Sequence, residues 1–125
     1  MIALEQIGLE RFQARADDAA RLMKALSNRN RLMILCRLTG GERQVGDLAA
    51  EVGLSQSALS QHLARLRRDG LVNTRRNAQT IFYSMNDRAT QAILRTLYDI
   101  YSPAELTESI KQKLFCDPKK PDEKT

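Results

Sequence analysis

The side chains whose types and spacing suit chemistry gather in one stretch, S-Q-S-A-L-S-Q-H-L-A-R-L-R-R-D-G, residues 55–70. Leu59, Leu63 and Leu66 recur at helical spacing, so one side of this stretch is predicted to face a core. The opposite side presents hydroxyls, amides, an imidazole and guanidinium groups, which match the donors and acceptors of base edges and phosphates. Because no acid precedes Asp69, we expect this helix to enter a DNA major groove. The candidate contacts are Ser55, Gln56, Ser57, Ser60, Gln61, His62, Arg65 and Arg68.

Other interpretations of these side chains are weaker. The serines could be nucleophiles, but no base in workable geometry and no G-x-S-x-G elbow accompanies them, so we expect no catalytic residue and no enzymatic activity. His62 could bind a metal, but it has no partner at metal-ligand spacing, and a base or phosphate contact is preferred. Arg65 and Arg68 could be ordinary solvated charges, yet their company on one acid-poor face favours DNA.

The elements on either side of this helix predict how it is positioned. Val45 to Val52 has the pattern of a short helix, and Gly53 breaks it just before the polar-faced helix, as in a helix-turn-helix. After Gly70 the periodicity changes to two, which predicts strands at 71–75 and 80–85 joined by a polar turn at 76–79. Such a hairpin is a wing that can touch the DNA backbone or a minor groove. Its candidate contacts are Arg75, Arg76, Asn77, Gln79 and Thr80.

Helices are predicted at both ends of this unit. Leu9 to Leu26 and residues 28–38 form the first two, and another runs from a cap at Asn86 or Asp87 to Pro103. The last helix has a wide apolar stripe that needs cover, most simply from the first helix and from a second copy of the chain. The methionines at apolar positions are expected to fill the core: Met23, Met33 and Met85.

The domain boundaries follow from these elements. Residues 9–102 are predicted to form a winged helix-turn-helix domain for DNA binding and dimerisation, after an N-terminal arm of residues 1–8. Residues 103–116 carry the spacing for an extra C-terminal helix. Residues 117–125 contain no apolar side chain and are expected to be a disordered tail.

Composition agrees with a nucleic-acid partner. The 125 residues support one compact domain, and the net charge of +5 is concentrated in residues 55–85, where five arginines face one aspartate. With 5% aromatic residues and no tryptophan, base stacking on aromatic platforms is not expected. No apolar run approaches the roughly 18 residues of a membrane span, and the acidic start is unlike a secretion signal. We therefore expect a cytoplasmic protein without a membrane partner.

Four motifs together resemble the ArsR family of bacterial transcription repressors. They are A-L-S-N-R-N-R-L-M-I-L (25–35), V-G-D-L-A (45–49), L-S-Q-S-A-L-S-Q-H-L-A-R-L-R-R-D-G-L-V (54–72) and R-R-N-A-Q-T-I-F-Y (75–83). The resemblance implies a mainly α fold with a two-stranded wing, in the order α-α-α-α-β-β-α, that dimerises through its first and last helices. It also implies binding to palindromic double-stranded DNA. The reading helix and second strand look closest to the subgroup of HlyU, NolR and BigR-like regulators.

The metal ligands of the family are missing from their usual positions. Metal-sensing members carry a Cys-x-Cys pair where this chain has Gln44-Val45-Gly46, and Asp and His ligands in a last helix that here contains no histidine. We therefore expect no bound metal and no cofactor.

Cys36 and Cys116 are the candidate redox residues. Cys36 lies between Leu35 and Leu38, where a small thiol packed as a hydrophobe is common. In redox-sensing relatives, a cysteine at this place pairs with one near the end of the last helix, and here that position is Tyr101-Ser102. A Cys36–Cys116 disulfide would need Cα atoms within about 7 Å. An inert or singly modified Cys36 is the preferred interpretation, and a redox- or sulfur-responsive pair is the alternative.

The sequence thus predicts a homodimeric repressor that binds an inverted-repeat operator. An activator or anti-repressor with the same DNA contacts is one alternative. A winged-helix module that binds a protein partner through its first and last helices is another.

Overall fold

The computed structural model describes residues 2–102, which form six helices and three strands. In chain order the elements are α1 (Ile2–Ala14), α2 (Ala16–Leu26), α3 (Arg29–Leu38), β1 (Arg43–Gln44), α4 (Val45–Val52), α5 (Gln56–Arg68), β2 (Asn73–Asn77), β3 (Thr80–Ser84) and α6 (Arg88–Tyr101). The extra helix and the tail expected at 103–116 and 117–125, and Cys116, lie outside the described residues. None of the helices within residues 2–102 has the length and apolarity needed to cross a membrane.

Short polar side chains begin three of the helices. Asn28 accepts a hydrogen bond from the Arg31 N–H at the start of α3, and Ser55 does the same for Ala58 in α5. Asp87, one of the two residues expected to cap the last helix, accepts from the Thr90 N–H at 2.9 Å. Each cap satisfies a backbone donor that the first helical turn leaves without a partner.

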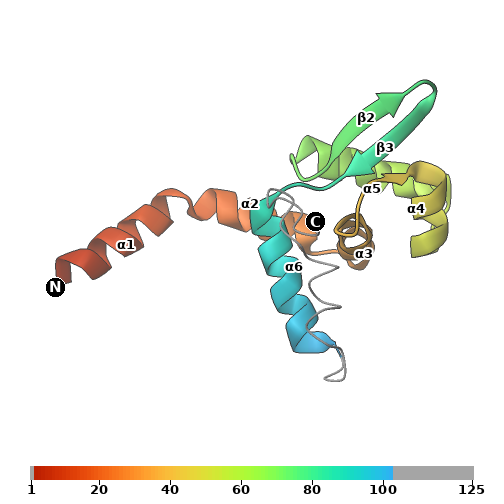
Figure 1. The fold of residues 1–125 in the computed structure, drawn as a ribbon. Coiled ribbons are helices and arrows are strands. Elements are labelled where there is room, and N and C mark those ends of the chain that lie inside the picture. Colours follow the sequence, from red (N-terminus) through yellow and green to blue (C-terminus); the bar gives the residue numbers. More distant parts are fainter. Residues whose placement is uncertain (1, 103–125) are drawn as a thin grey trace, which may run out of the picture.

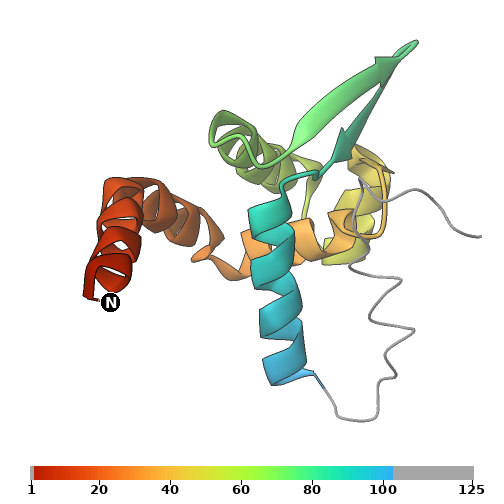
Figure 2. The ribbon, with the colours of Figure 1, turned by 60° about the vertical axis from the view of Figure 1, so that its left-hand side comes forward.

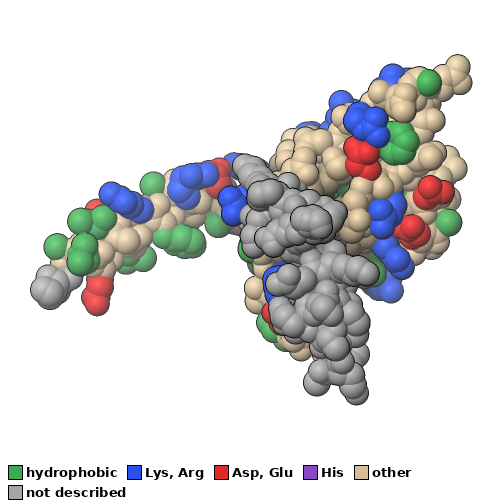
Figure 3. Space-filling view, in the orientation of Figure 1, with side chains coloured by type: hydrophobic (Ala, Val, Ile, Leu, Met, Phe, Trp, Pro, Cys, Tyr) green, Lys and Arg blue, Asp and Glu red, His purple; other side chains and the backbone are tan. Residues whose placement is uncertain are grey.

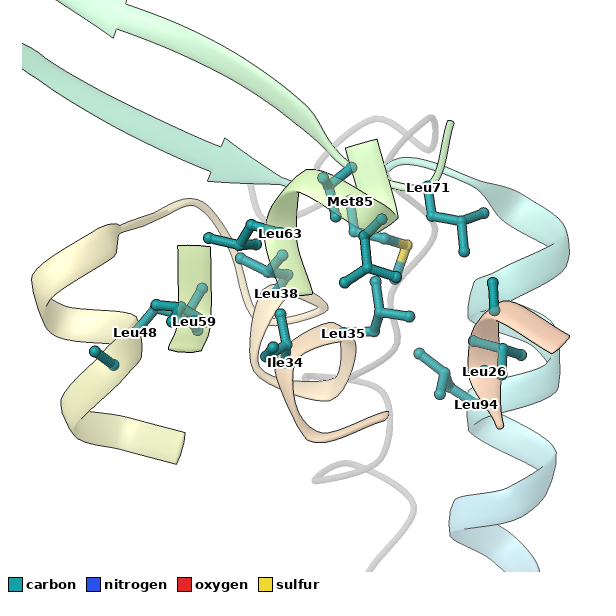
Figure 4. Packing of buried hydrophobic residues seen from close by; sticks show 14 residues of the cluster. Leu26, Ile34, Leu35, Leu38, Leu48, Leu59, Leu63, Leu71, Met85 and Leu94 are labelled. Atoms are coloured by element: carbon teal, nitrogen blue, oxygen red, sulfur yellow. The ribbon is translucent and has the colours of Figure 1, made fainter. Parts of the chain in front are cut away.

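The core lies where α3, α4 and α5 meet, with α6 closing one side (Figure 4). Its side chains are mostly leucines at helical spacing. Those with at most 1% exposure include Ile34, Leu35, Leu48, Leu59 and Leu63. Met85 is buried as expected, whereas Met23 and Met33 are 56% and 39% exposed. The expectation that they fill the core of this chain was therefore wrong, because apolar spacing on a helix does not say which neighbour covers it.

The sheet has three strands, in the order β1-β3-β2. β2 and β3 form the predicted hairpin, which projects from the body as a ribbon (Figure 1). The hairpin is longer at its tip than expected, since Arg76 and Asn77 still pair and only Ala78 and Gln79 form the turn. The sequence did not predict β1, whose two residues pair with β3 next to Tyr83 and Phe82.

The first predicted helix is two helices. Arg15 leaves the helical conformation with φ −111° and ψ 10°, and its side chain binds Asp18 at 2.7 Å. The chain is already helical from Ile2, so residues 2–8, expected as an arm, are the first turns of α1. α1 points away from the body in both ribbon views (Figures 1 and 2). This position leaves Leu9 and Phe12, both within the first predicted helix, exposed.

Candidate nucleic-acid interface

Buried leucines fix the orientation of α5. Leu59, Leu63 and Leu66 have at most 1% exposure and pack into the core, so the opposite side of α5 must face outward. Ser57, Gln61 and Arg68 lie on that side and are exposed, and around it Gln56 and Ser60 are exposed while His62 and Arg65 are half-buried. The structure therefore brings the predicted reading residues together on one outward face.

The turn between α4 and α5 is built on Gly53. This residue has φ 75° and ψ 33°, the left-handed conformation that glycine adopts without strain. The backbone N–H groups of Gly53 and Leu54 both donate to the Ala49 carbonyl, at 2.9 and 3.0 Å, and close the end of α4. Ser55 then caps α5 directly, with its hydroxyl 3.1 Å from the Ala58 nitrogen. The short helix, the turn and the second helix have the geometry of a helix-turn-helix.

Charge along α5 is uneven. Its first turn has no acid, and its last turn holds Arg65, Arg67 and Arg68. Asp69, the residue after the helix, lies 3.5 Å from Arg65 and partly compensates it. Arg67 and Arg68 line a shallow hollow between α5 and the wing, together with Ser60 and Tyr83. Neither Arg67 nor Tyr83 was among the predicted contacts. The arginine-rich run at 65–68 was a signal for Arg67, but Tyr83 arrives from a distant strand.

The two arginines of the wing have different environments. Arg75 forms an ion pair with Glu42, with Nη2 and Oε1 2.8 Å apart, and its guanidinium lies 4.6 Å from the centre of the Phe82 ring. Arg76 is exposed and makes no ion pair with any residue from 2 to 102. Asn77 and Gln79 are also exposed at the hairpin tip, and Thr80 is half-buried. Basic, acidic and hydrophobic side chains meet where the wing joins the body (Figure 3).

The ion pair at the wing also shifts the pKa values of its two partners. Hydrogen bonding to the Arg75 guanidinium lowers the pKa of the Glu42 carboxyl, and the same contact raises the pKa of Arg75. Both shifts favour the charged forms that make up the pair, so neither group loses its charge near neutral pH.

Cys36 is the one candidate redox residue that the structure describes. It is half-buried against the core, and burial raises the pKa of its thiol. A raised pKa lowers the thiolate fraction at neutral pH and makes the sulfur a weaker nucleophile. Within residues 2–102 no three His, Cys, Asp or Glu side chains gather as a metal site would require. The expectation of no bound metal stays a prediction.

Comparison with known proteins identifies the family. The pattern described as bacterial regulatory protein, arsR family, matches residues 28–74. The transcriptional activator HlyU of Vibrio cholerae is 47% identical over 98 residues, 78% of this chain and 91% of HlyU. The chain belongs to the ArsR family. The nodulation protein NolR of Rhizobium meliloti is 50% identical over 98 residues, 78% of this chain and 79% of NolR.

A solved ArsR-family structure has the same fold. The crystal structure of the transcriptional repressor BigR from Xylella fastidiosa aligns with a TM-score of 0.71 at 40% identity, over 75% of this chain and 96% of BigR. The family resemblance and the winged helix expected from the sequence are therefore confirmed. This ArsR-family chain is a DNA-binding transcriptional regulator.

Proposed function

We propose that this ArsR-family regulator acts in the cytoplasm as a homodimer on an inverted-repeat operator, with α5 as the reading helix. One observation carries the proposal: the outward face of α5 is polar, exposed and free of acids up to Asp69. Side chains near the N-terminus of a reading helix reach base edges, and those further along meet phosphates. Gln56, Ser57, Ser60, Gln61 and His62 are therefore assigned to bases or their margins, and Arg65 and Arg68 to phosphates.

The exposed apolar side chains of α1 and α6 support the proposal that the chain pairs with a second copy of itself. On α1 they are Leu4, Ile7, Leu9 and Phe12, between 44% and 76% exposed, and on α6 they are Ile100 and Tyr101, 63% and 81% exposed. Figure 3 shows hydrophobic side chains along the projecting α1. Apolar surface of this extent on a small soluble domain calls for a protein neighbour. A two-fold dimer would also place two reading helices one DNA turn, or a multiple, apart.

We propose repression as the outcome of binding. The relatives include both a named activator, HlyU, and a named repressor, BigR. The same DNA contacts serve both outcomes, and the place of the operator in the promoter decides between them. An operator that overlaps the polymerase site gives repression, which reporter transcription with and without the protein would measure.

No catalytic step, metal or cofactor enters this proposal. The outward face of α5 holds hydroxyls, but within residues 2–102 no hydrogen bond joins Ser57 or Ser60 to His62. Cys36 is proposed to be structural or singly modified, because its raised pKa disfavours the thiolate. Operator affinity under oxidant, compared between the protein and Cys36→Ser, tests this: a loss confined to the parent protein would instead make Cys36 a sensor.

The deciding experiment selects bound sequences from random duplex DNA and then compares variants on the selected site. An inverted repeat is expected. Gln56→Ala should weaken the selected site by roughly 1–3 kcal/mol while leaving random DNA nearly unchanged. Equal weakening on both kinds of DNA would contradict the base-reading role. Retention on random duplex that does not respond to salt would contradict DNA binding altogether.

The dimer is tested separately by its mass in solution. Phe12→Asp places a charge on the exposed face of α1 without touching the core of the winged helix. The parent protein is expected at twice the mass of one chain, and the variant is expected to dissociate on dilution. A parent protein that stays monomeric at micromolar concentration would refute the proposed dimer.

A further inference from the structure

Glu42 and Phe82 hold the Arg75 side chain from two directions. Arg75 donates from Nε to Glu42 Oε2 at 2.9 Å and from Nη2 to Glu42 Oε1 at 2.8 Å. The guanidinium also lies over the Phe82 ring, 4.6 Å from its centre. A bidentate pair combined with a ring contact fixes the plane and the position of a guanidinium, which a single hydrogen bond does not.

Glu42 is itself attached to the helix-turn-helix. It directly precedes β1, and Arg43 of that strand donates from Nη1 to the Gly41 and Glu42 carbonyls at 3.2 and 3.1 Å. The Nε atom of Arg43 donates to Glu51 of α4 at 3.2 Å. Gly41 has φ +131°, a conformation that other residues rarely adopt. A continuous chain of polar contacts therefore runs from α4 through the loop before β1 to the wing.

The strand register separates the two wing arginines. Arg75 is paired with Phe82, and Arg76 with Ile81, so their side chains emerge on opposite faces of the ribbon. Tyr83 belongs to the same face as Ile81, and it lines the hollow beside α5. Arg76 therefore lies on the same face of the wing as Tyr83, which is the face directed toward α5. Arg75 lies on the other face, against Glu42.

We propose that Glu42 is a positioning residue that clamps the wing through Arg75, and that Arg76 is the wing arginine that meets a DNA phosphate. This inference rests on the proposed DNA-binding function and divides roles that the sequence assigned to both arginines alike. The clamp sets the angle between the hairpin and α5, because its far end is attached to α4, which packs against α5.

The ion pair adds to a short attachment between the hairpin and the body. A two-stranded ribbon alone is marginally stable in water. Among residues 2–102, the strand pairing between the ribbon and the body is that of β1 with β3, at Arg43–Tyr83 and Gln44–Phe82. An ion pair at the surface contributes little to global stability. It contributes more to orientation when it lies, as here, beside the only strand pairing that joins the described wing to the helices.

The first test needs no DNA and measures hydrogen exchange of the backbone amides that pair β1 with β3. Glu42→Gln and Arg75→Gln should each speed exchange by about two- to fivefold, as expected for a bidentate surface pair. The double variant should be no faster than either single variant, because both changes remove the same interaction. Unchanged exchange in the single variants, or effects that multiply in the double variant, would overturn the clamp.

The second test counts phosphate contacts through the salt dependence of binding to a random-sequence duplex. Arg76→Gln should lower the slope of log affinity against log salt by about one, and Arg75→Gln should lower it no more than Glu42→Gln does, because both of these changes remove only the clamp. The exchanged pair, Glu42→Arg with Arg75→Glu, keeps the net charge and should retain the slope of the parent protein. A slope that falls by about one in Arg75→Gln and stays unchanged in Glu42→Gln would make Arg75 a DNA contact and overturn the assignment.

The two tests separate the inference from the proposed function. If the parent protein shows no salt-sensitive DNA binding, the proposed function fails. The exchange measurements then still decide, independently, whether Glu42 and Arg75 hold the wing.

Discussion

Arg31 should contribute more to stability than any exposed arginine of this protein. Arg31 lies in α3 and is only 9% exposed. Its side chain reaches back to the end of α2. Nε donates to the Ala25 carbonyl at 2.6 Å, and Nη2 donates to the Lys24 carbonyl at 3.2 Å. The guanidinium therefore satisfies carbonyls at a helix end, where no intrahelical donor is available, and joins the α1–α2 arm to the winged helix.

The size of the effect follows from these contacts. Lys24 keeps a partner when Arg31 is replaced, because its carbonyl also accepts from the Ser27 N–H at 3.2 Å. The main loss is the short bond to Ala25, a buried residue. Hydrogen bonds from charged donors are worth about 1.5–3 kcal/mol. Arg31→Met, which preserves much of the aliphatic volume, should thus lower the free energy of unfolding by about 2–3 kcal/mol.

Urea unfolding followed by circular dichroism measures this loss. The variants must be compared at one protein concentration, because dimerisation would make the apparent stability depend on it. Arg37→Met is the matched control, since Arg37 is exposed on the same helix, and its cost should stay within about 0.5 kcal/mol. An Arg31→Met cost as small as that of the control would refute the reasoning.

Three further expectations can be checked with the same protein. Ser55→Ala should lower the free energy of unfolding by about 1 kcal/mol, because the Ser55 hydroxyl caps α5. Ser57→Ala, an exposed control position in α5, should cost less. Equal costs for the two variants would count against the cap. Ala78→Gly should stabilise the hairpin by up to about 1 kcal/mol, since Ala78 has φ 58°; a lower melting temperature would contradict this. In the Cys116→Ser variant, the Cys36 thiol should react with iodoacetamide near neutral pH more slowly than the thiol of the unfolded protein, because burial raises the pKa of Cys36. Equal reaction rates in buffer and in urea would contradict this expectation.

Much of the reading unit was predictable from local sequence. Helix α4 has the predicted bounds, Val45–Val52. Ser55 is the cap of α5, and Gly70, with φ +79°, follows its end as expected. These features depend on interactions within a few residues, namely caps, turns and the spacing of leucines. Such short-range interactions can be predicted from residues that lie close together in the sequence.

Features that depend on distant residues were not predictable in the same way. The break at Arg15 interrupts a pattern that reads as one helix, and β1 is too short to give a periodicity. Met23 and Met33 lie at apolar positions without being covered by this chain. In each case the outcome depends on which surfaces meet, and spacing along one element does not contain that information.

The sequence by itself determined that α5 has a buried leucine side and a polar, acid-poor side, since both follow from its helical period. It also determined that a basic hairpin comes next. Only the tertiary structure decided that Arg75 turns to Glu42, 33 positions away, while its neighbour Arg76 faces the side of the reading helix. The physical reason is that strand register and the packing of β1 against β3 set these partners, and both arise only when distant segments fold together.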